Sequence, residues 1–286
     1  MTKAEIPNEP GRVDVDPAES ELSNIPLPHS AETLSKRQLA AADRDYGGAG
    51  VAERYATEVG HTLGPDQLAR QFFYRIIPKD LSGMRVLDIA CGNGSFTYDD
   101  LPLRNPTKVI GIDIEREMIA VAKAQAGDRA KFGVMDMHRL GLRDHSFDLA
   151  VSGFGLHYSE DLGGLFKEIA RVLKPGADLI FLTNMVRSPH QSLQEIGEVQ
   201  DEIVRGPKLP IILTPGDNPL VVLNIPYAER DYVTAMRQAG FELVDLTRFK
   251  ANHKLHNKSD ERISQPPYPY AERIDLHAVV VTGRKL

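Results

Sequence analysis

The chain lacks several features that would define whole classes of protein. Cys91 is its only cysteine, which excludes an intrachain disulfide and a cysteine-rich zinc site. No apolar run approaches the roughly 18 to 20 residues of a membrane span. The N-terminal sequence MTKAEIPNEP has acids and prolines where a signal peptide needs an apolar centre. We therefore expect a cytoplasmic protein without a membrane partner.

Positive charge is also scarce. The 34 Lys and Arg residues are outnumbered by 40 Asp and Glu residues, so the formal net charge is −6. Binding to a phosphate backbone needs a concentrated positive surface, and the chain has no long basic run. We expect no nucleic-acid partner, while monomer and homodimer both remain open.

The N-terminal quarter differs in composition from the rest. Residues 1–40 are rich in Glu, Asp, Pro and Ser and poor in large apolar side chains, which predicts a disordered or loosely packed tail. Residues 41–83 are predicted to form lid helices, with a break at Gly60 and before Pro65. In the second helix Leu68, Phe72 and Ile76 recur every four residues on one face.

From residue 84 onward, short apolar runs alternate with helix-like stretches. Five runs come first: MRVLDIA, KVIGIDI, AKFGVMD, FDLAVSG and ADLIFLTN. Helices are expected at 115–126 and 162–173, and the Lys174-Pro175-Gly176 turn ends the second one. A helix at 228–239 and strands at 241–249 and 276–283 complete the pattern. Strands and helices alternating at this pitch indicate an α/β fold, a mostly parallel sheet with helices on both faces.

A small-residue turn follows the first of these strands. Gly92 and Gly94 allow the backbone to approach a ligand where a β-carbon would clash, and a following helix N-terminus favours a carboxylate. Asp113 ends the second strand about 20 positions later, where a doubly wound fold holds a ribose diol. Asp136 ends the third strand, and Asp88 lies in the first. These acids are predicted to converge on one crevice.

Each acid also has a purely structural interpretation. Asp88 would cap the turn that follows it, and Asp113 would cap the helix beginning at Glu115, because Asp favours such positions. Cys91 is most simply a small buried filler.

These segments resemble the successive motifs of a known family. VLDIACGNGSF, VIGIDI, VMDM and SFDLAVSGFGLHYSED are similar to class I S-adenosylmethionine-dependent methyltransferases, especially the small-molecule, ubiquinone-biosynthesis-type branch. EIARVLKPGADLIFLTN is similar to the segment that follows them. The resemblance covers residues 84–185, is weaker at 42–83 and 228–286, and is absent from 1–40 and 186–226. It implies a methyltransferase core over 84–286, a Rossmann-like doubly wound seven-stranded sheet with its last strand antiparallel.

The resemblance also implies a cofactor, S-adenosyl-L-methionine, and residues that bind it. Asp88 and the backbone around Gly92 and Gly94 would hold the methionine end, and Ser152 would approach the sulfonium. The ribose and adenine would be bound by Asp113, Ile114, Asp136 and Met137. Tyr46, on the lid helices, is a further candidate for the cofactor.

The 186–226 segment interrupts the alternation and is predicted to be a substrate-cap insertion. It holds one amphipathic helix, near 191–204, and then a loop-prone apolar stretch. The apolar runs 211–213 and 220–223 fit three interpretations: a pocket for an apolar or aromatic acceptor, a dimer contact, or ordinary core.

Methyl transfer from a sulfonium is a displacement that mainly needs alignment and exclusion of water. A base helps when the acceptor must lose a proton. His157, just after the fourth strand, is the first candidate base, and His190, after the fifth, is the second. Alternatively, His157 is a histidine that packs against its neighbours, and His190 is a residue at the start of a helix. Tyr55 and Tyr158 are predicted to contact the substrate, and oxygen is favoured over nitrogen or carbon as the methylated atom.

Two rival functions remain. A nicotinamide-dependent oxidoreductase would use G-x-G-x-x-G, but Thr97 stands where the third glycine belongs. The second rival is a methyltransferase-like protein that binds the cofactor, or only a partner, without catalysing methyl transfer. No metal site is expected, because His253 and His256 lie in a loop-like stretch without an obvious carboxylate partner.

Overall fold

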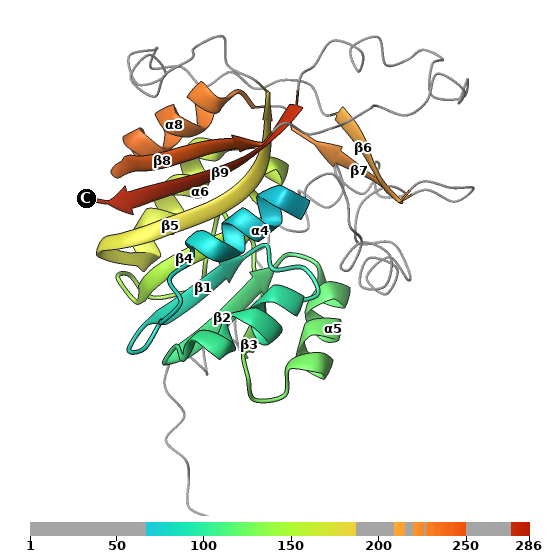
Figure 1. Ribbon diagram of the computed structural model, residues 1–286, viewed down its shortest axis with the longest axis vertical. Coiled ribbons are helices and arrows are strands. Elements are labelled where there is room, and N and C mark those ends of the chain that lie inside the picture. The colour runs from blue at the N-terminus through green and yellow to red at the C-terminus, as the bar shows by residue number, and fades with distance from the viewer. Residues whose placement is uncertain (1–66, 187–208, 215–219, 226, 250–275) are drawn as a thin grey trace, which may run out of the picture.

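The computed structural model describes residues 67–186, 209–214, 220–225, 227–249 and 276–286, and all structural statements concern these. The tail 1–40, most of the lid 41–83 and the helix expected near 191–204 lie outside them. So do Tyr46, Tyr55 and His190. Figure 1 shows the arrangement of the described elements.

The core of the fold is a seven-stranded sheet with strand order β3-β2-β1-β4-β5-β9-β8. Its strands are β1 (Arg85–Ile89), β2 (Lys108–Asp113), β3 (Lys131–Val134), β4 (Phe147–Gly153), β5 (Leu173–Val186), β8 (Phe241–Phe249) and β9 (Leu276–Lys285). The five strands β1 to β5 are parallel to one another, and β9 is antiparallel to both β5 and β8. The predicted doubly wound sheet with its last strand antiparallel is confirmed.

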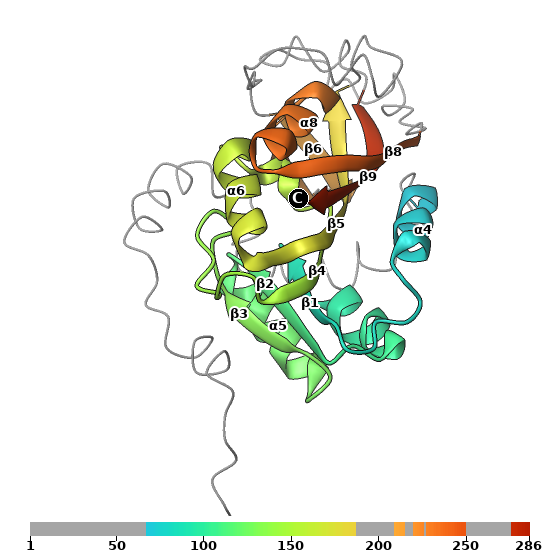
Figure 2. The same cartoon turned by 90° about the vertical axis from the view of Figure 1, so that its left-hand side faces the viewer.

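Two apolar clusters cover opposite faces of the sheet. On one face α6 (Leu162–Val172) and α8 (Glu229–Gln238) pack over the sheet, and on the other α4 (Gln67–Ile76) and α5 (Arg116–Ala126) do so. Figure 2 shows α6 and α8 on one side of the sheet and α4 on the other. The chain order reverses between β1 and β4, and at this switch point a doubly wound sheet opens a crevice at the carboxyl ends of its strands.

The helix α6 shows how the sequence fixes an element. Its N-cap is Asp161, whose side chain accepts a hydrogen bond from the backbone N–H of Gly164 at 2.9 Å. Leu165, Phe166 and Ile169 form a fully buried stripe along one face. Burial of such side chains stabilises the fold by about 1.5–3 kcal/mol each.

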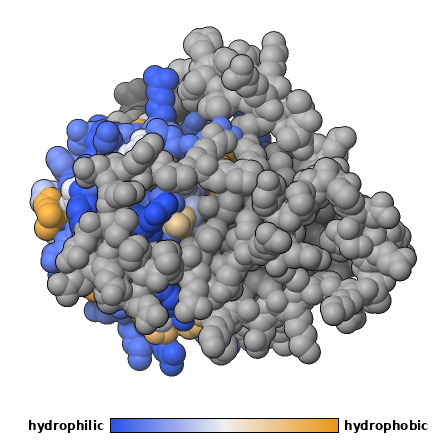
Figure 3. All heavy atoms as spheres, turned by 90° about the horizontal axis from the view of Figure 1, so that it is seen from above, coloured by the Kyte–Doolittle hydropathy of each residue, from blue (hydrophilic) through white to orange (hydrophobic). Residues whose placement is uncertain are grey.

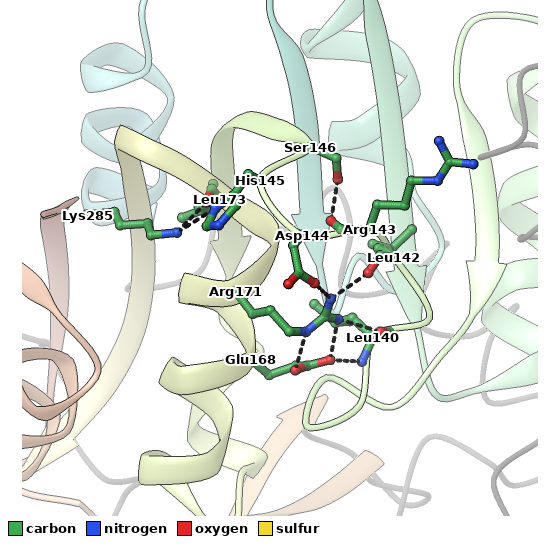
Figure 4. A network of polar contacts seen from close by, with 10 residues as sticks. All are labelled: Leu140, Leu142, Arg143, Asp144, His145, Ser146, Glu168, Arg171, Leu173 and Lys285. Atoms are coloured by element: carbon green, nitrogen blue, oxygen red, sulfur yellow. Dashed lines mark hydrogen bonds and ion pairs between the residues drawn. The ribbon is translucent and has the colours of Figure 1, made fainter.

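Arg171, at the end of α6, ties that helix to the loop before β4 (Figure 4). Its guanidinium donates to both carboxylate oxygens of Glu168 and to the carbonyl oxygens of Leu140 and Leu142, at 2.7–2.9 Å. It also forms an ion pair with Asp144. Glu168 accepts the backbone N–H of Leu140 at 2.6 Å. One side chain thus satisfies several backbone groups of a loop that has no secondary structure of its own.

Three local features differ from the expectations. The segment expected to be loop-prone contains a hairpin, β6 (Leu209–Thr214) and β7 (Leu220–Asn224), because its two branched apolar runs flank a Pro-Gly-Asp-Asn-Pro sequence suited to a turn. The helix expected after the glycine turn is a π-helical turn, Phe96–Asp100, followed by a 3-10 turn, Pro102–Arg104. Strand β5 begins at Leu173 and includes the Lys-Pro-Gly sequence, which was expected to be a turn. Phe147 of β4 pairs with Leu173 and Leu149 with Asp178, so these residues of β5 form an irregularity in the pairing.

The described surface seen in Figure 3 is mostly hydrophilic, with isolated apolar spots. Within the described ranges, no helix is both long enough and apolar enough to cross a bilayer.

Candidate active site

The turn after β1 has an unusual backbone. Ala90, Gly92 and Gly94 all have positive φ, at 54°, 57° and 75°, a region that L side chains avoid and glycine tolerates. A β-carbon on Gly92 would meet no heavy atom within 4 Å, whereas one on Gly94 would lie 2.6 Å from the Phe132 ring. Among the described residues Gly92 therefore borders open space, and Gly94 is required for packing against the core.

Asp113 clamps this turn to the end of β2. Its Oδ2 accepts the backbone N–H of Gly92 at 2.8 Å, and its Oδ1 accepts that of Glu115 at 2.9 Å. The expected cap of α5 by Asp113 is therefore wrong, because this bond goes to the N–H of Glu115, the residue before the helix, and α5 has no side-chain cap among the described residues. The carboxylate still has lone pairs for a ligand hydroxyl. Burial raises the pKa of Asp113, although backbone N–H groups favour its charged form. Ile114 beside it is an exposed apolar side chain.

Asp88 is a buried carboxyl with one described partner. It is 2% exposed, and its Oδ2 accepts the Thr97 hydroxyl at 2.6 Å. Burial, aided by the charge of Asp113, raises the pKa of Asp88 to about 7. The carboxyl ties the π-helical turn to β1 through a side chain rather than capping a backbone N–H. A cationic ligand group beside it would restore its charged form.

Asp136 lies at the end of β3 and is held by His138. The backbone N–H and the Nδ1 of His138 each lie 2.8 Å from Asp136 Oδ1, and His138 Nε2 lies 2.8 Å from the Ser159 hydroxyl. Burial opposes ionisation of Asp136, but the bonds from His138 outweigh it and keep the pKa of the carboxyl below its usual value. Met137 is partly buried against the core. The sequence analysis missed His138, although the Asp-Met-His spacing was visible.

The end of β4 meets the turn after β1. A β-carbon on Gly155 would lie 2.3 Å from the Ala90 Cβ and 3.1 Å from the Ser152 hydroxyl. Ser152 is fully buried, and its hydroxyl has no hydrogen-bond partner in the described part of the chain. Buried polar groups are nearly always hydrogen-bonded, so this hydroxyl is suited to a polar group of a ligand.

His157 lies beyond β4 in a closed environment. It is 2% exposed, its Nδ1 lies 3.0 Å from the Thr183 hydroxyl, and that oxygen lies 3.4 Å from the hydroxyl of Tyr232. Burial lowers the pKa of His157 to about 3. The Tyr158 ring packs 4.3 Å from the His157 ring, centroid to centroid. This environment matches the packed-histidine interpretation, and the role of His157 as a base stays a prediction.

Most of the predicted site residues lie in the last residues of four adjacent strands, β1, β2, β3 and β4, or in the segments just after them. They are Asp88, Gly92, Gly94, Asp113, Ile114, Asp136, Met137, Ser152, His157 and Tyr158. In the described segments, no three His, Cys, Asp or Glu side chains are grouped so as to hold a metal ion.

Comparison with known proteins identifies the domain. Residues 87–181 match the model of a methyltransferase domain. These residues are thus similar to a methyltransferase domain, over about a third of the chain.

Two curated relatives and one solved structure illustrate the similarity of this methyltransferase domain. It is 37% identical over 106 residues to demethylmenaquinone methyltransferase of Lactococcus lactis, covering 35% of this chain and 42% of that protein. It is 28% identical over 119 residues to malonyl-[acyl-carrier protein] O-methyltransferase of Legionella pneumophila, covering 41% of this chain and 42% of that protein. Each match thus spans about two fifths of the relative's length.

An S-adenosylmethionine-dependent methyltransferase from Mesorhizobium loti shares the fold. Its crystal structure superposes with a TM-score of 0.52 at 23% identity, covering 78% of this chain and 100% of that one. The likeness extends the class I methyltransferase fold beyond the residues that the family model matches.

Proposed function

We propose that this protein binds S-adenosyl-L-methionine and transfers its methyl group to a small-molecule acceptor. The observation that carries the proposal is the buried Asp88 carboxyl, which has a single hydroxyl partner among the described residues and lies in β1, just before the Gly92 turn. The ammonium group of a bound cofactor would supply the missing counter-charge.

The remaining groups at the crevice fit the other parts of the cofactor. The free lone pairs of Asp113 would accept the ribose hydroxyls, and the exposed Ile114 side chain would pack against the nucleoside. Asp136 would accept the adenine amino group. The Ser152 hydroxyl, which has no partner among the described residues, would bind the methionine end. When bound, the cofactor supplies an electrophilic methyl group on a positively charged sulfur.

The acceptor would approach from the segment that follows β5. We propose that residues 186–226 form the substrate cap. Its hairpin ends next to the loop after β4, where the backbone N–H of Ile225 donates to the carbonyl oxygen of His157 at 3.1 Å. A cap in this position would align the acceptor and exclude water, which are the main requirements of the displacement. Oxygen is the favoured acceptor atom, and the Legionella relative is by name an O-methyltransferase.

The nicotinamide alternative has less support. Thr97 occupies the place of the third fingerprint glycine, and its hydroxyl is buried against Asp88. A methyltransferase-like protein without catalysis would have the same cofactor crevice, and only the detection of a methylated product separates it from an enzyme.

Calorimetric titration with S-adenosylhomocysteine tests the cofactor assignment, with NAD as the competing ligand. We expect micromolar binding of the former alone. Preference for NAD, or binding of neither ligand, would remove the proposal.

Replacing Asp113 with Ala should weaken S-adenosylhomocysteine binding by about 1–3 kcal/mol, because ligand hydroxyls and the Gly92 N–H lose their acceptor. Asp148→Ala is the matched control. Asp148 accepts the Arg85 N–H and pairs with Lys174 at the opposite end of the sheet, so its loss should leave the affinity unchanged. Equal effects of the two variants would contradict the ribose assignment.

The His157 ring should remain neutral from pH 8 down to about pH 4, because its pKa is lowered to about 3. Nitrogen NMR chemical shifts of the labelled ring measure this, and the His157→Gln variant assigns the signal. Titration near pH 6.5 would show that the ring is accessible to protons and would strengthen its assignment as a base.

A further inference from the structure

A chain of hydrogen bonds connects the ends of β3 and β4. It runs from the carboxylate of Asp136 through the His138 ring to the Ser159 hydroxyl, with 2.8 Å at each step. Ser159 is fully buried and also accepts the backbone N–H of Asp161 at 3.1 Å. Asp161 caps α6, so the far end of the chain rests on a fixed helix.

His138 holds one oxygen of Asp136 twice. Its backbone N–H and its ring Nδ1 both contact Oδ1, which fixes the carboxylate against rotation about its terminal bond. With Nδ1 as donor, Nε2 accepts the Ser159 hydroxyl proton, so every member of the chain has a compatible role. In the described part of the chain, no donor reaches Asp136 Oδ2.

We propose that His138 is a positioning residue that directs Asp136 Oδ2 at the exocyclic amino group of the cofactor's adenine. The inference rests on the proposed function and adds a source of base specificity to it. The sequence motifs include Asp136 but do not include the histidine that orients it.

If Asp136 is held in this way, the site should bind adenine more tightly than a base that carries an oxo group in place of the amino group. The adenine amino group donates a hydrogen bond to a carboxylate, whereas the 6-oxo group of hypoxanthine presents an acceptor to an acceptor. A fixed carboxylate cannot rotate away from that contact, so its rigidity converts a hydrogen bond into specificity.

The experiment compares S-adenosylhomocysteine with S-inosylhomocysteine by calorimetry in the wild type and three variants. His138→Leu removes both ring contacts. His138→Asn retains a donor at the position of Nδ1, and His138→Gln places its amide at the position of Nε2, toward Ser159. Thermal midpoints of all four proteins establish that they are folded.

We expect the wild type and His138→Asn to prefer the adenine ligand strongly. In His138→Leu and His138→Gln, adenine affinity should fall roughly tenfold while inosine affinity changes less than about twofold, so the preference shrinks. If His138→Leu does not fold, the contrast between Asn and Gln carries the test.

Equal weakening of both ligands in the Leu and Gln variants would overturn the positioning role and leave a purely structural one. Retention of full adenine preference in both variants would overturn it as well. Failure of the wild type to bind S-adenosylhomocysteine would instead refute the proposed function, which distinguishes the two failures.

Discussion

Replacing Asp88 with Asn is expected to stabilise the unliganded protein at pH 8 and to weaken its binding of the cofactor. Burial raises the pKa of this carboxyl from its ordinary value of 3.8 to about 7. Between these two values the folded protein retains a proton that the unfolded chain has released. Folding stability therefore falls as the pH rises through this range, and the full penalty is present above pH 7.

Asparagine avoids this penalty because it carries no charge and can still accept the Thr97 hydroxyl. Relative to the wild type, the gain in the free energy of unfolding should be near zero at pH 4 and on the order of 4 kcal/mol at pH 8. Urea denaturation at both pH values measures it. Asp99→Asn is the control in the same π-helical turn: Asp99 pairs with Arg129 on the surface, where such pairs contribute about 0–1 kcal/mol.

The same variant should bind S-adenosylhomocysteine more weakly, because a hydrogen bond to a charged group contributes about 1.5–3 kcal/mol. Wild-type affinity should also fall as the pH drops below 7, where Asp88 gains a proton, and Asp88→Asn should lose this pH dependence. A loss of stability in the variant at pH 8 would mean that the protein itself already compensates the buried charge.

Replacing Arg171 with Leu is expected to reduce the free energy of unfolding by on the order of 3 kcal/mol. The change removes the donor to the Leu140 and Leu142 carbonyl oxygens and leaves the Glu168 carboxylate with the Leu140 N–H but no counter-charge from Arg171. Partly buried groups that lose their partners are costly. Arg171→Lys should recover only part of the loss, because an ammonium cannot match the planar fork of the guanidinium.

Arg284→Met provides the matched control for Arg171. Arg284 forms an equally bidentate pair with Asp178, but it is half exposed, so its removal should cost about 0–1 kcal/mol. Urea denaturation at constant pH compares the two. Cofactor affinity should be unchanged in Arg171→Leu, since the network lies at the amino end of β4. Equal losses in the two variants would show that the loop does not depend on Arg171.

The sheet could be predicted because its signal is local. Apolar runs such as VIGID at β2 alternate with amphipathic stretches such as α6, and each of the first three runs holds an acid at or near its end. Chain position also predicted that Asp88, Asp113 and Asp136 lie at neighbouring strand ends.

The side-chain partners could not be predicted in the same way. The pairing of Asp88 with Thr97 and of His138 with Ser159 depends on how loops fold back, which no spacing determines. The position of His157 just after β4 indicated proximity to the crevice, but burial depends on Thr183 and Tyr232, which are far away in sequence. The hairpin β6–β7 was missed because short apolar runs between prolines fit a strand and a loop equally well.

The position of β9 between β5 and β8 has a consequence for synthesis on the ribosome. In the described sheet β8 pairs only with β9, although β8 is translated first. While the intervening segment is being made, the outer edge of β5 and the whole of β8 have unpaired backbone groups. Unpaired strand edges can pair with other chains and cause aggregation. We therefore expect the nascent protein to depend on chaperones until β9 is synthesised and pairs with both β5 and β8.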